Sequence, residues 1–407
     1  MSVATAPAES VDVSAHHYTQ LDGLRGLAIL LVIVYHFSLE HAAFRGPAPG
    51  FFLQLAQAGW MGVDLFFVLS GFLITGILSG TRSKPHYFRN FLARRFLRIW
   101  PLYYLSLLVL LVVAPLLLPQ VWAGRLQGMQ DQQAWFWLYA ANWLFAKEGG
   151  FSQTAGGYFW SLAVEEQFYV IWPFVVYALS TRMLLRVSFG LLCCSLLLRV
   201  VLSAFGVGTG VLYNMTFTHL DGLATGACLS ICLRSPELTA RVMRALPWVA
   251  GVALLGLVGV RLHDHHLFFW GRAMAACGYT LIVALFAALL VLALRDRDGQ
   301  RLRRFLRSRF MSLCGTYSYA LYLVHVPVAS LVYPALRKLH LLQDLLGYDA
   351  VFLLAGAVAF AISWALAAAS WFLIESRILA FKRYFAAPPG PPPGPAGGVP
   401  TQMSAAP

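Results

Sequence analysis

The sequence feature that most limits the possible folds of this chain is a set of long stretches without a single charged residue. Residues 27–39, 102–118, 248–260, 281–294 and 351–374 contain no Asp, Glu, Lys or Arg. The sequence as a whole is 59% apolar and 12% charged, against roughly 45–50% and about 25% in an average soluble domain. Hydrocarbon is the natural solvent for such segments. A soluble globule is excluded, and the chain is predicted to be an all-α polytopic integral membrane protein.

Apolar length and loop charge predict about ten transmembrane helices. The expected ranges are 21–41, 59–79, 99–118, 158–180, 184–204, 212–233, 246–262, 271–294, 312–333 and 349–374. With both termini in the cytoplasm, inner segments hold 21 of the 30 Lys and Arg residues and outer loops hold seven. This asymmetry predicts the orientation by the positive-inside rule. The aromatic stretch 132–146 is short and is expected to be interfacial or re-entrant.

One membrane domain is expected over residues 17–385. It lies between a disordered N-terminal segment, 1–16, and a disordered Pro/Gly-rich tail, 386–407. The first twenty residues lack Lys and Arg, so the first apolar helix is expected to be retained rather than cleaved. The formal net charge of +13 is distributed between apolar runs, which favours topology over nucleic-acid binding. The six cysteines lack metal-finger spacing, so neither a disulfide nor a metal site is predicted.

Arg25 and His36 lie within the first expected span. Eleven residues are about three helical turns, so both side chains share one face, roughly 16 Å apart along the axis. An ionisable group near a helix centre costs about 2.5–3.5 kcal/mol and therefore needs a reason. This helix offers a fixed cation near the cytoplasm and a titratable base deep in the membrane. Structural packing of a single histidine is an equally good explanation.

The same rise per residue places further ionisable side chains near the depth of His36. Asp64, Glu165 and His325 fall at nearly the same level on three other expected spans, and Asp221 falls slightly lower, near the midplane. Converging acid–base groups are what a buried reaction chamber needs. The sequence therefore predicts one shared layer of ionisable groups, with interhelical ion pairs as the alternative.

Two stripes of polar side chains recur at one-turn spacing. They are Ser161, Glu165 and Tyr169 in the fourth expected span, and Ser318, Tyr322 and His325 in the ninth. Each stripe either lines a cavity or forms hydrogen bonds between packed helices. A carboxylate on such a face is suited to orient an imidazole.

Arginines gather at the cytoplasmic end of the third expected span. The segment FLARRFLRIWPLYY places Arg94 or Arg95, and Arg98, a turn apart near the depth of Arg25. Guanidinium groups bind phosphates in bidentate fashion. Positive-inside placement also explains arginines at this edge without any ligand.

These motifs together resemble the acyltransferase-3 family of integral membrane acyltransferases. The segments that carry the resemblance, in chain order, are LDGLRGLAILLVIVYHF with Arg25 and His36, GVDLFFVLSGFLI, RRFLRIWPLYY, WSLAVEEQFY and SYALYLVHVP. They cover the chain from about residue 17 to 385. Each motif alone is weak, but five in the family's order are specific.

The resemblance implies a ten-helix O-acyltransferase of the bacterial inner membrane. It implies transfer of an acyl group, most often acetyl, from cytoplasmic acyl-CoA to a hydroxyl of a cell-envelope glycan or glycosylated metabolite. No tightly bound cofactor is implied, because acyl-CoA is the donor substrate. Some members append an extracytoplasmic SGNH-hydrolase domain, and the sequence is expected to be of the stand-alone type.

Residue roles follow from combining the resemblance with the predicted depths. The family's motifs map onto Arg25 and His36, onto Arg94 and Arg98, and onto Ser161 and Glu165. The arginines are expected to hold the donor phosphates. His36 is expected to act as general base or to carry the acyl group itself, with Asp64 or Glu165 orienting the imidazole. The side chains expected to contact substrate are Ser161, Tyr169, Asp221 and His325.

Two other functions fit some of these features. Intramembrane His, Asp and Glu residues also occur in proton-coupled transporters, although no internal repeat is visible in this sequence. A scaffold protein of the envelope would use the same buried groups only as structural contacts. The expected partners of an acyltransferase are membrane lipid, acyl-CoA and a glycan or glycolipid acceptor, and nucleic acid is not expected.

Overall fold

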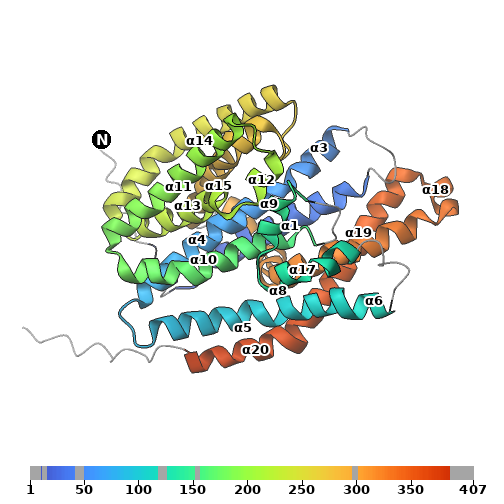
Figure 1. Ribbon diagram of the computed structural model, residues 1–407, viewed down its shortest axis with the longest axis horizontal. Coiled ribbons are helices and arrows are strands. Elements are labelled where there is room, and N and C mark those ends of the chain that lie inside the picture. Colours follow the sequence, from blue (N-terminus) through green and yellow to red (C-terminus); the bar gives the residue numbers. More distant parts are fainter. Residues whose placement is uncertain are drawn as a thin grey trace, which may run out of the picture.

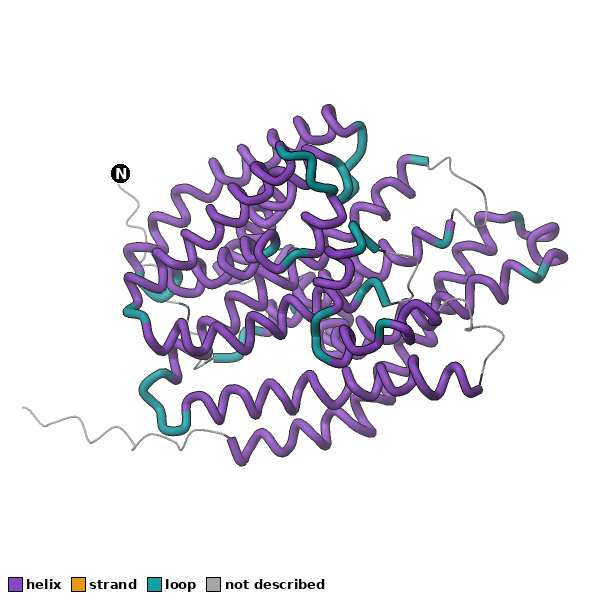
Figure 2. The backbone as a smooth tube through the Cα atoms, viewed as in Figure 1, coloured by secondary structure: helices purple, strands orange, loops and turns teal. Residues whose placement is uncertain are grey.

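The described part of the chain is built from helices, with no strand among its residues (Figures 1 and 2). The computed structural model describes residues 11, 16–41, 50–117, 126–151, 156–295 and 301–385. Apart from Val11 and His16, the predicted disordered segment 1–16 and the whole predicted tail 386–407 lie outside the described residues. The predicted all-α polytopic fold class is confirmed.

Within the described ranges, nine helices are 17 residues or longer. They are α1 (Thr19–Leu39), α4 (Gly62–Thr81), α5 (Tyr87–Leu108), α10 (Phe159–Ala178), α11 (Thr181–Ala204), α14 (Pro236–Asp264), α15 (Tyr279–Arg295), α17 (Arg309–Arg337) and α19 (Tyr348–Ser370). The shorter helices are α3 (Phe51–Gln57), α6 (Ala114–Leu117), α8 (Gln133–Trp137), α9 (Ala141–Lys147), α12 (Thr209–Asn214), α13 (Leu220–Cys232), α16 (Arg301–Leu306), α18 (His340–Leu346) and α20 (Ser376–Ala380). Single 3₁₀ or π turns are η1 (Ala58–Met61), η2 (Val109–Val113), η3 (Thr216–Thr218), η4 (Met274–Gly278), η5 (Trp371–Glu375) and η6 (Phe381–Phe385).

Eight helical segments of the described chain are long and apolar enough to cross a membrane. They coincide with eight of the ten expected spans. The other two expected spans correspond to α10, a 20-residue helix that carries Glu165 and Glu166, and to α13, which has 13 residues. The aromatic stretch 132–146 forms the short helices α8 and α9, neither of which is long enough to span a bilayer.

The centre of the fold is made by α1, α4, α13 and α17. The most extensive helix contacts are those of α1 with α17 and of α4 with α13. Glycines allow this close approach: a Cβ on Gly315 would collide with the backbone of Asp22, and a Cβ on Gly71 with the backbone of Leu223. The α1–α17 contact therefore brings the expected first and ninth spans, with their ionisable residues, against each other.

Helices α11 and α14 lie at the periphery, on one side of this centre (Figure 1). Large apolar side chains are exposed along them, including Phe189, Leu197, Trp248 and Leu255. Exposed apolar surface of this extent suits contact with lipid. The N-terminus of α14 is stabilised by its local sequence. The Ser235 hydroxyl accepts a hydrogen bond from the Leu238 amide, and Pro236 occupies the first helical position.

Helix α5 runs along the opposite edge of the molecule, next to α20 (Figure 1). The final turn η6 also packs against α5. This packing carries Lys382 and Phe385 to the arginine-rich half of α5, where both side chains line the same cavity as Arg94 and Arg98. The chain's C-terminal described turn thereby becomes part of the candidate site.

Candidate active site

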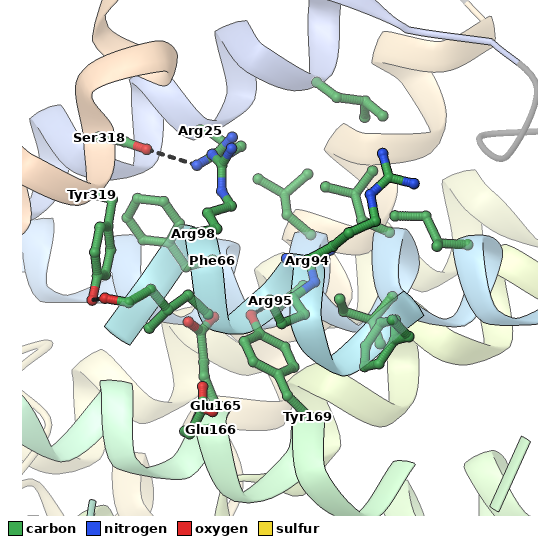
Figure 3. Close-up of a pocket in the computed structure, with 18 of the residues that line it drawn as sticks. Arg25, Phe66, Arg94, Arg95, Arg98, Glu165, Glu166, Tyr169, Ser318 and Tyr319 are labelled. Atoms are coloured by element: carbon green, nitrogen blue, oxygen red, sulfur yellow. Dashed lines mark hydrogen bonds between the residues drawn. The ribbon is translucent and has the colours of Figure 1, made fainter. Parts of the chain in front are cut away.

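A cavity of about 700 Å³ opens between α1, α4, α5, α10 and α17 (Figure 3). Its lining combines arginines, carboxylates and hydroxyls with apolar side chains such as Phe66 and Leu73. A hollow of this size that combines apolar walls with converging polar groups is typical of a small-molecule site. The cavity is therefore the candidate binding site.

Four arginines form one wall of the cavity: Arg25 of α1 and Arg94, Arg95 and Arg98 of α5. The Arg25 guanidinium donates to the Ser318 hydroxyl at 3.1 Å, and Figure 3 shows Arg98 directly beside it. Within the described residues, Arg94, Arg95 and Arg98 form no hydrogen bond or ion pair with the protein. The predicted set of Arg25, Arg94 and Arg98 lies together, and Arg95 joins it.

Arg95 also organises the neighbouring wall. Its guanidinium lies 5.4 Å from the ring centroid of Tyr169 and 5.8 Å from that of Phe91. The sequence motif leaves open whether Arg94 or Arg95 faces inward. In the structure both line the cavity.

The stripe predicted on the fourth span lies on the opposite wall. Ser161, Glu165 and Tyr169 of α10 all line the cavity. The Tyr169 hydroxyl bonds to Ser70 of α4, and both hydroxyls face the Glu165 carboxylate, which in turn faces Arg25 and Arg95. Glu165 is thus surrounded by hydroxyls and guanidiniums, and the predicted shared face of these three residues is confirmed.

Tyr322 of α17 connects this wall to the interior. Its hydroxyl donates to the Tyr158 carbonyl oxygen at 2.7 Å and therefore accepts from Ser161, 2.6 Å away. The Tyr322 ring lines the cavity on one side, and on the other its centroid lies 5.8 Å from that of His325. Tyr322 and Ser161 therefore separate the cavity from the residues behind them.

Those residues are a pair of histidines, His36 of α1 and His325 of α17. His325 Nε2 lies 3.1 Å from His36 Nδ1, and the ring centroids are 4.9 Å apart. His325 is fully buried, whereas His36 is half-buried. Neither ring lines the arginine cavity itself. The structure thus brings two of the predicted site residues into contact.

The prediction that one carboxylate orients His36 is corrected by this contact. The Asp64 carboxylate lies next to His219, with Oδ1 3.9 Å from Nε2, and Glu165 lies in the arginine cavity. In the described residues, no carboxylate bonds to the His36 ring. Depth alone placed these groups in one layer, but the sides of α4 and α10 that carry the carboxylates face different neighbours.

Asp221 also lies away from the cavity, in a buried ion pair. Its Oδ2 is 2.7 Å from Arg199 Nη2, and both side chains are almost completely buried. The Thr280 hydroxyl donates to the same carboxylate oxygen at 2.7 Å, and Arg199 also donates to the Thr218 carbonyl oxygen. The ionisable groups expected to converge therefore lie in three places: the cavity, the histidine pair and this cluster.

His219 is a residue that sequence reasoning missed. Its ring is enclosed by Phe67, Trp160, Tyr213 and Tyr279, with centroid distances of 5.0–6.0 Å. It comes immediately before α13, outside any polar stripe, so spacing gives no signal for it. Arg199 did carry a signal, because a lone arginine inside an expected span requires a buried acidic partner.

Comparison of the sequence with known proteins identifies related acyltransferases. Residues 18–368 match the family model of an acyltransferase domain. The peptidoglycan O-acetyltransferase OatA of Listeria monocytogenes is 27% identical over 339 residues, which are 80% of this chain and 51% of that protein. YrhL of Bacillus subtilis is 32% identical over 337 residues, 78% of this chain and 50% of that protein.

OatA of Staphylococcus aureus, an O-acetyltransferase, is 27% identical over 329 residues, 77% of this chain and 51% of that protein. This chain spans about half the length of the curated relatives it matches. No solved structure matches it. The family model covers most of the sequence, including every predicted site residue. The chain belongs to the acyltransferase-3 family of integral membrane acyltransferases.

Proposed function

We propose that this protein is a membrane O-acyltransferase that moves an acetyl group from acetyl-CoA to a hydroxyl of a cell-envelope glycan. The observation that carries the proposal is the arginine cavity, whose three α5 guanidiniums form no hydrogen bond or ion pair with the described protein, backed by the histidine pair. Family membership favours this function over a proton-coupled transporter.

The charge of the cavity fits the donor. Six basic side chains line it: Lys84 and Lys382 in addition to the four arginines. Three acidic side chains, Asp22, Glu165 and Glu166, also line it. Guanidiniums crowded in this way repel each other unless an anion lies between them, and they bind phosphate in bidentate fashion. The diphosphate and 3′-phosphate of coenzyme A supply that anion.

The chemistry requires a base near the acceptor hydroxyl. A neutral imidazole is suited to this task because it accepts a proton near neutral pH. In the proposed reaction, His36 takes the proton of the acceptor hydroxyl, the hydroxyl oxygen bonds to the acyl carbon, and the carbon–sulfur bond breaks. The proton then passes to the leaving thiolate, which restores the neutral imidazole.

The acceptor class is suggested by the relatives. The Listeria and Staphylococcus proteins are named as O-acetyltransferases, and the names of the Listeria protein and of YrhL both include peptidoglycan. Peptidoglycan or another envelope glycan is therefore the first acceptor to test, and the bacterial cytoplasmic membrane is the proposed location. The separation of His36 from the arginine cavity supports entry of donor and acceptor from different sides.

The function is tested by release of free thiol from acetyl-CoA by the purified full chain in detergent. The assay is run with and without soluble peptidoglycan fragments or a crude envelope glycan extract. His36→Ala is compared with His265→Ala, a matched control in the exposed loop after α14. A positioned base contributes about 10²–10⁴-fold, so His36→Ala is expected to lose at least that much.

Acetylated glycan formed by the wild type and by His265→Ala, but not by His36→Ala, supports the proposal. Folded wild-type protein that releases no thiol from any acyl-CoA with any glycan overturns it.

A further inference from the structure

The contact between the two histidines has a definite direction. His325 Nδ1 lies 2.9 Å from the Leu321 carbonyl oxygen, and its Nε2 lies 3.1 Å from His36 Nδ1. His36 Nδ1 lies in addition 2.9 Å from the Val32 carbonyl oxygen. Each ring therefore has its Nδ1 against a backbone carbonyl, which only accepts hydrogen bonds.

These partners determine where the protons lie. A neutral imidazole has one N–H, and the nitrogen that faces a carbonyl must be the donor. In His325 the proton is on Nδ1, so Nε2 is an acceptor. The burial of His325, with no carboxylate bonded to it in the described residues, favours the neutral ring.

The same reasoning extends to His36. Its Nδ1 faces two acceptors, the Val32 carbonyl oxygen and His325 Nε2, so the proton is on Nδ1 and is shared between them. His36 Nε2 then has no hydrogen and no hydrogen-bond partner among the described residues. It is the nitrogen left free to accept a proton from another molecule.

We propose that His325 is a positioning residue that holds His36 in the tautomer whose Nε2 is the reacting base. This inference rests on the proposed acyltransferase function and deepens it. His325 takes the place that a carboxylate has in a Ser-His-Asp triad, where the third group fixes the tautomer and orientation of the base. This proposal assigns His325 a role different from the substrate contact predicted from the sequence.

A neutral partner suits the low polarity of the site. During the reaction Nε2 of His36 gains the hydroxyl proton and the ring becomes a cation, whose Nδ1–H then donates more strongly to His325 Nε2. His325 keeps its own proton on Nδ1 throughout, so no further acid or base is required. A carboxylate in this position would need its own desolvation in the resting state, which a neutral imidazole avoids.

The surroundings keep His325 in this orientation. Its ring packs against Tyr158 and Tyr322, with centroids 6.0 and 5.8 Å away. The tight α1–α17 contact fixes the distance between the two helices that carry the pair. His325 is completely buried beside these rings, next to His36.

The test uses two amides of different reach and one apolar residue at position 325. In His325→Gln the amide oxygen reaches the place of Nε2 and still accepts from His36. In His325→Asn the amide ends near the place of Nδ1, so the variant keeps the bond to Leu321 but not the bond to His36. His325→Leu keeps neither.

We expect His325→Asn and His325→Leu to lower kcat by about 100-fold, within the range a positioned base contributes. The KM for acetyl-CoA should change by less than about threefold, because the arginine cavity is untouched. His325→Gln should recover at least about tenfold of the lost kcat. Thermal unfolding of each variant is measured in the same detergent to identify loss of fold.

A second readout is independent of activity. In protein labelled with ¹⁵N-histidine, the resonance of an unprotonated Nε2 is assigned to His36 by its loss in His36→Ala. It should persist in His325→Gln. In His325→Leu only the Val32 carbonyl oxygen still holds the Nδ1 proton, so the share of the other tautomer should rise measurably. Equal kcat in all three variants and wild type, or an unchanged tautomer in His325→Leu, overturns the inference. Absence of thiol release by folded wild type overturns the proposed function instead, while the tautomer measurement still decides the inference.

Discussion

Individual side chains in the arginine cavity are expected to act on binding rather than on chemistry. Arg95→Ala and Arg98→Ala each remove one guanidinium that faces the cavity. A hydrogen bond to a charged group is worth about 1.5–3 kcal/mol, which is about a 10- to 100-fold rise in KM for acetyl-CoA. Steady-state kinetics of thiol release give both constants, and kcat should change much less.

Arg241→Ala is the matched control for these variants, because Arg241 is exposed on α14 and pairs with Glu237. Its KM should equal that of the wild type. If KM is unchanged in both cavity variants, these arginines do not bind the phosphates of coenzyme A.

The buried Arg199–Asp221 pair is expected to act on stability. Asp221→Ala leaves an unpaired buried guanidinium, which typically costs about 3–5 kcal/mol. Replacing both partners, as Arg199→Met with Asp221→Leu, removes both charges and should recover most of the lost stability. Thermal unfolding in detergent compares the three proteins. A double variant as unstable as Asp221→Ala would show that the loss of stability does not come from the unpaired charge of Arg199.

The sequence anticipated residue positions better than residue partners. Spacing within one helix is local, so Ser161, Glu165 and Tyr169 lie on one face as predicted. Partners depend on how helices rotate against each other, and a single sequence contains no measure of that rotation. For this reason a carboxylate was expected beside His36, where the structure has His325.

At the scale of whole elements, the α1–α17 contact carries the candidate mechanism. A side chain at Gly315 would meet the backbone of Asp22, so Gly315→Leu must push the two helices apart. Overpacking of this kind costs about 1–3 kcal/mol, and a shift of about 1 Å between reacting groups costs about 100-fold in rate. Thiol release and thermal unfolding should therefore both fall.

Gly251→Leu on α14 is the control, because nothing lies within 4 Å of a Cβ at that position. It should leave activity and unfolding temperature near those of the wild type. Wild-type activity in Gly315→Leu would show that catalysis does not depend on the distance between the two histidines.

Hydropathy predicts the membrane-spanning helices correctly wherever the helix is uniformly apolar. Eight expected spans are recovered on this basis. Helix α10 was also anticipated, although Glu165 and Glu166 lower its apolar character, because the flanking aromatic and apolar residues continue the helix. The sixth expected span is divided instead into α12, η3 and α13, since Met215 adopts an extended backbone between them.

At the scale of the whole molecule, the arginine cavity and the predicted orientation point to the same side of the membrane. Of the six lysines and arginines that line the cavity, all but Arg25 come from segments that the positive-inside rule assigns to the cytoplasm: Lys84, Arg94, Arg95, Arg98 and Lys382. Coenzyme A thioesters are cytoplasmic. Acetyl-CoA can therefore be the donor only if the arginine cavity opens to the cytoplasm, as the predicted orientation requires.

Single cysteines in a cysteine-free background test this orientation in intact cells. Ser83 lies between α4 and α5, and His265 follows α14; both are exposed. A membrane-impermeant maleimide should label His265→Cys in intact cells and Ser83→Cys only after the membrane is permeabilised. Each variant is first shown to retain thiol release. The opposite labelling pattern would place the arginine cavity outside, away from coenzyme A, and its guanidiniums would then have to bind an anion of the envelope.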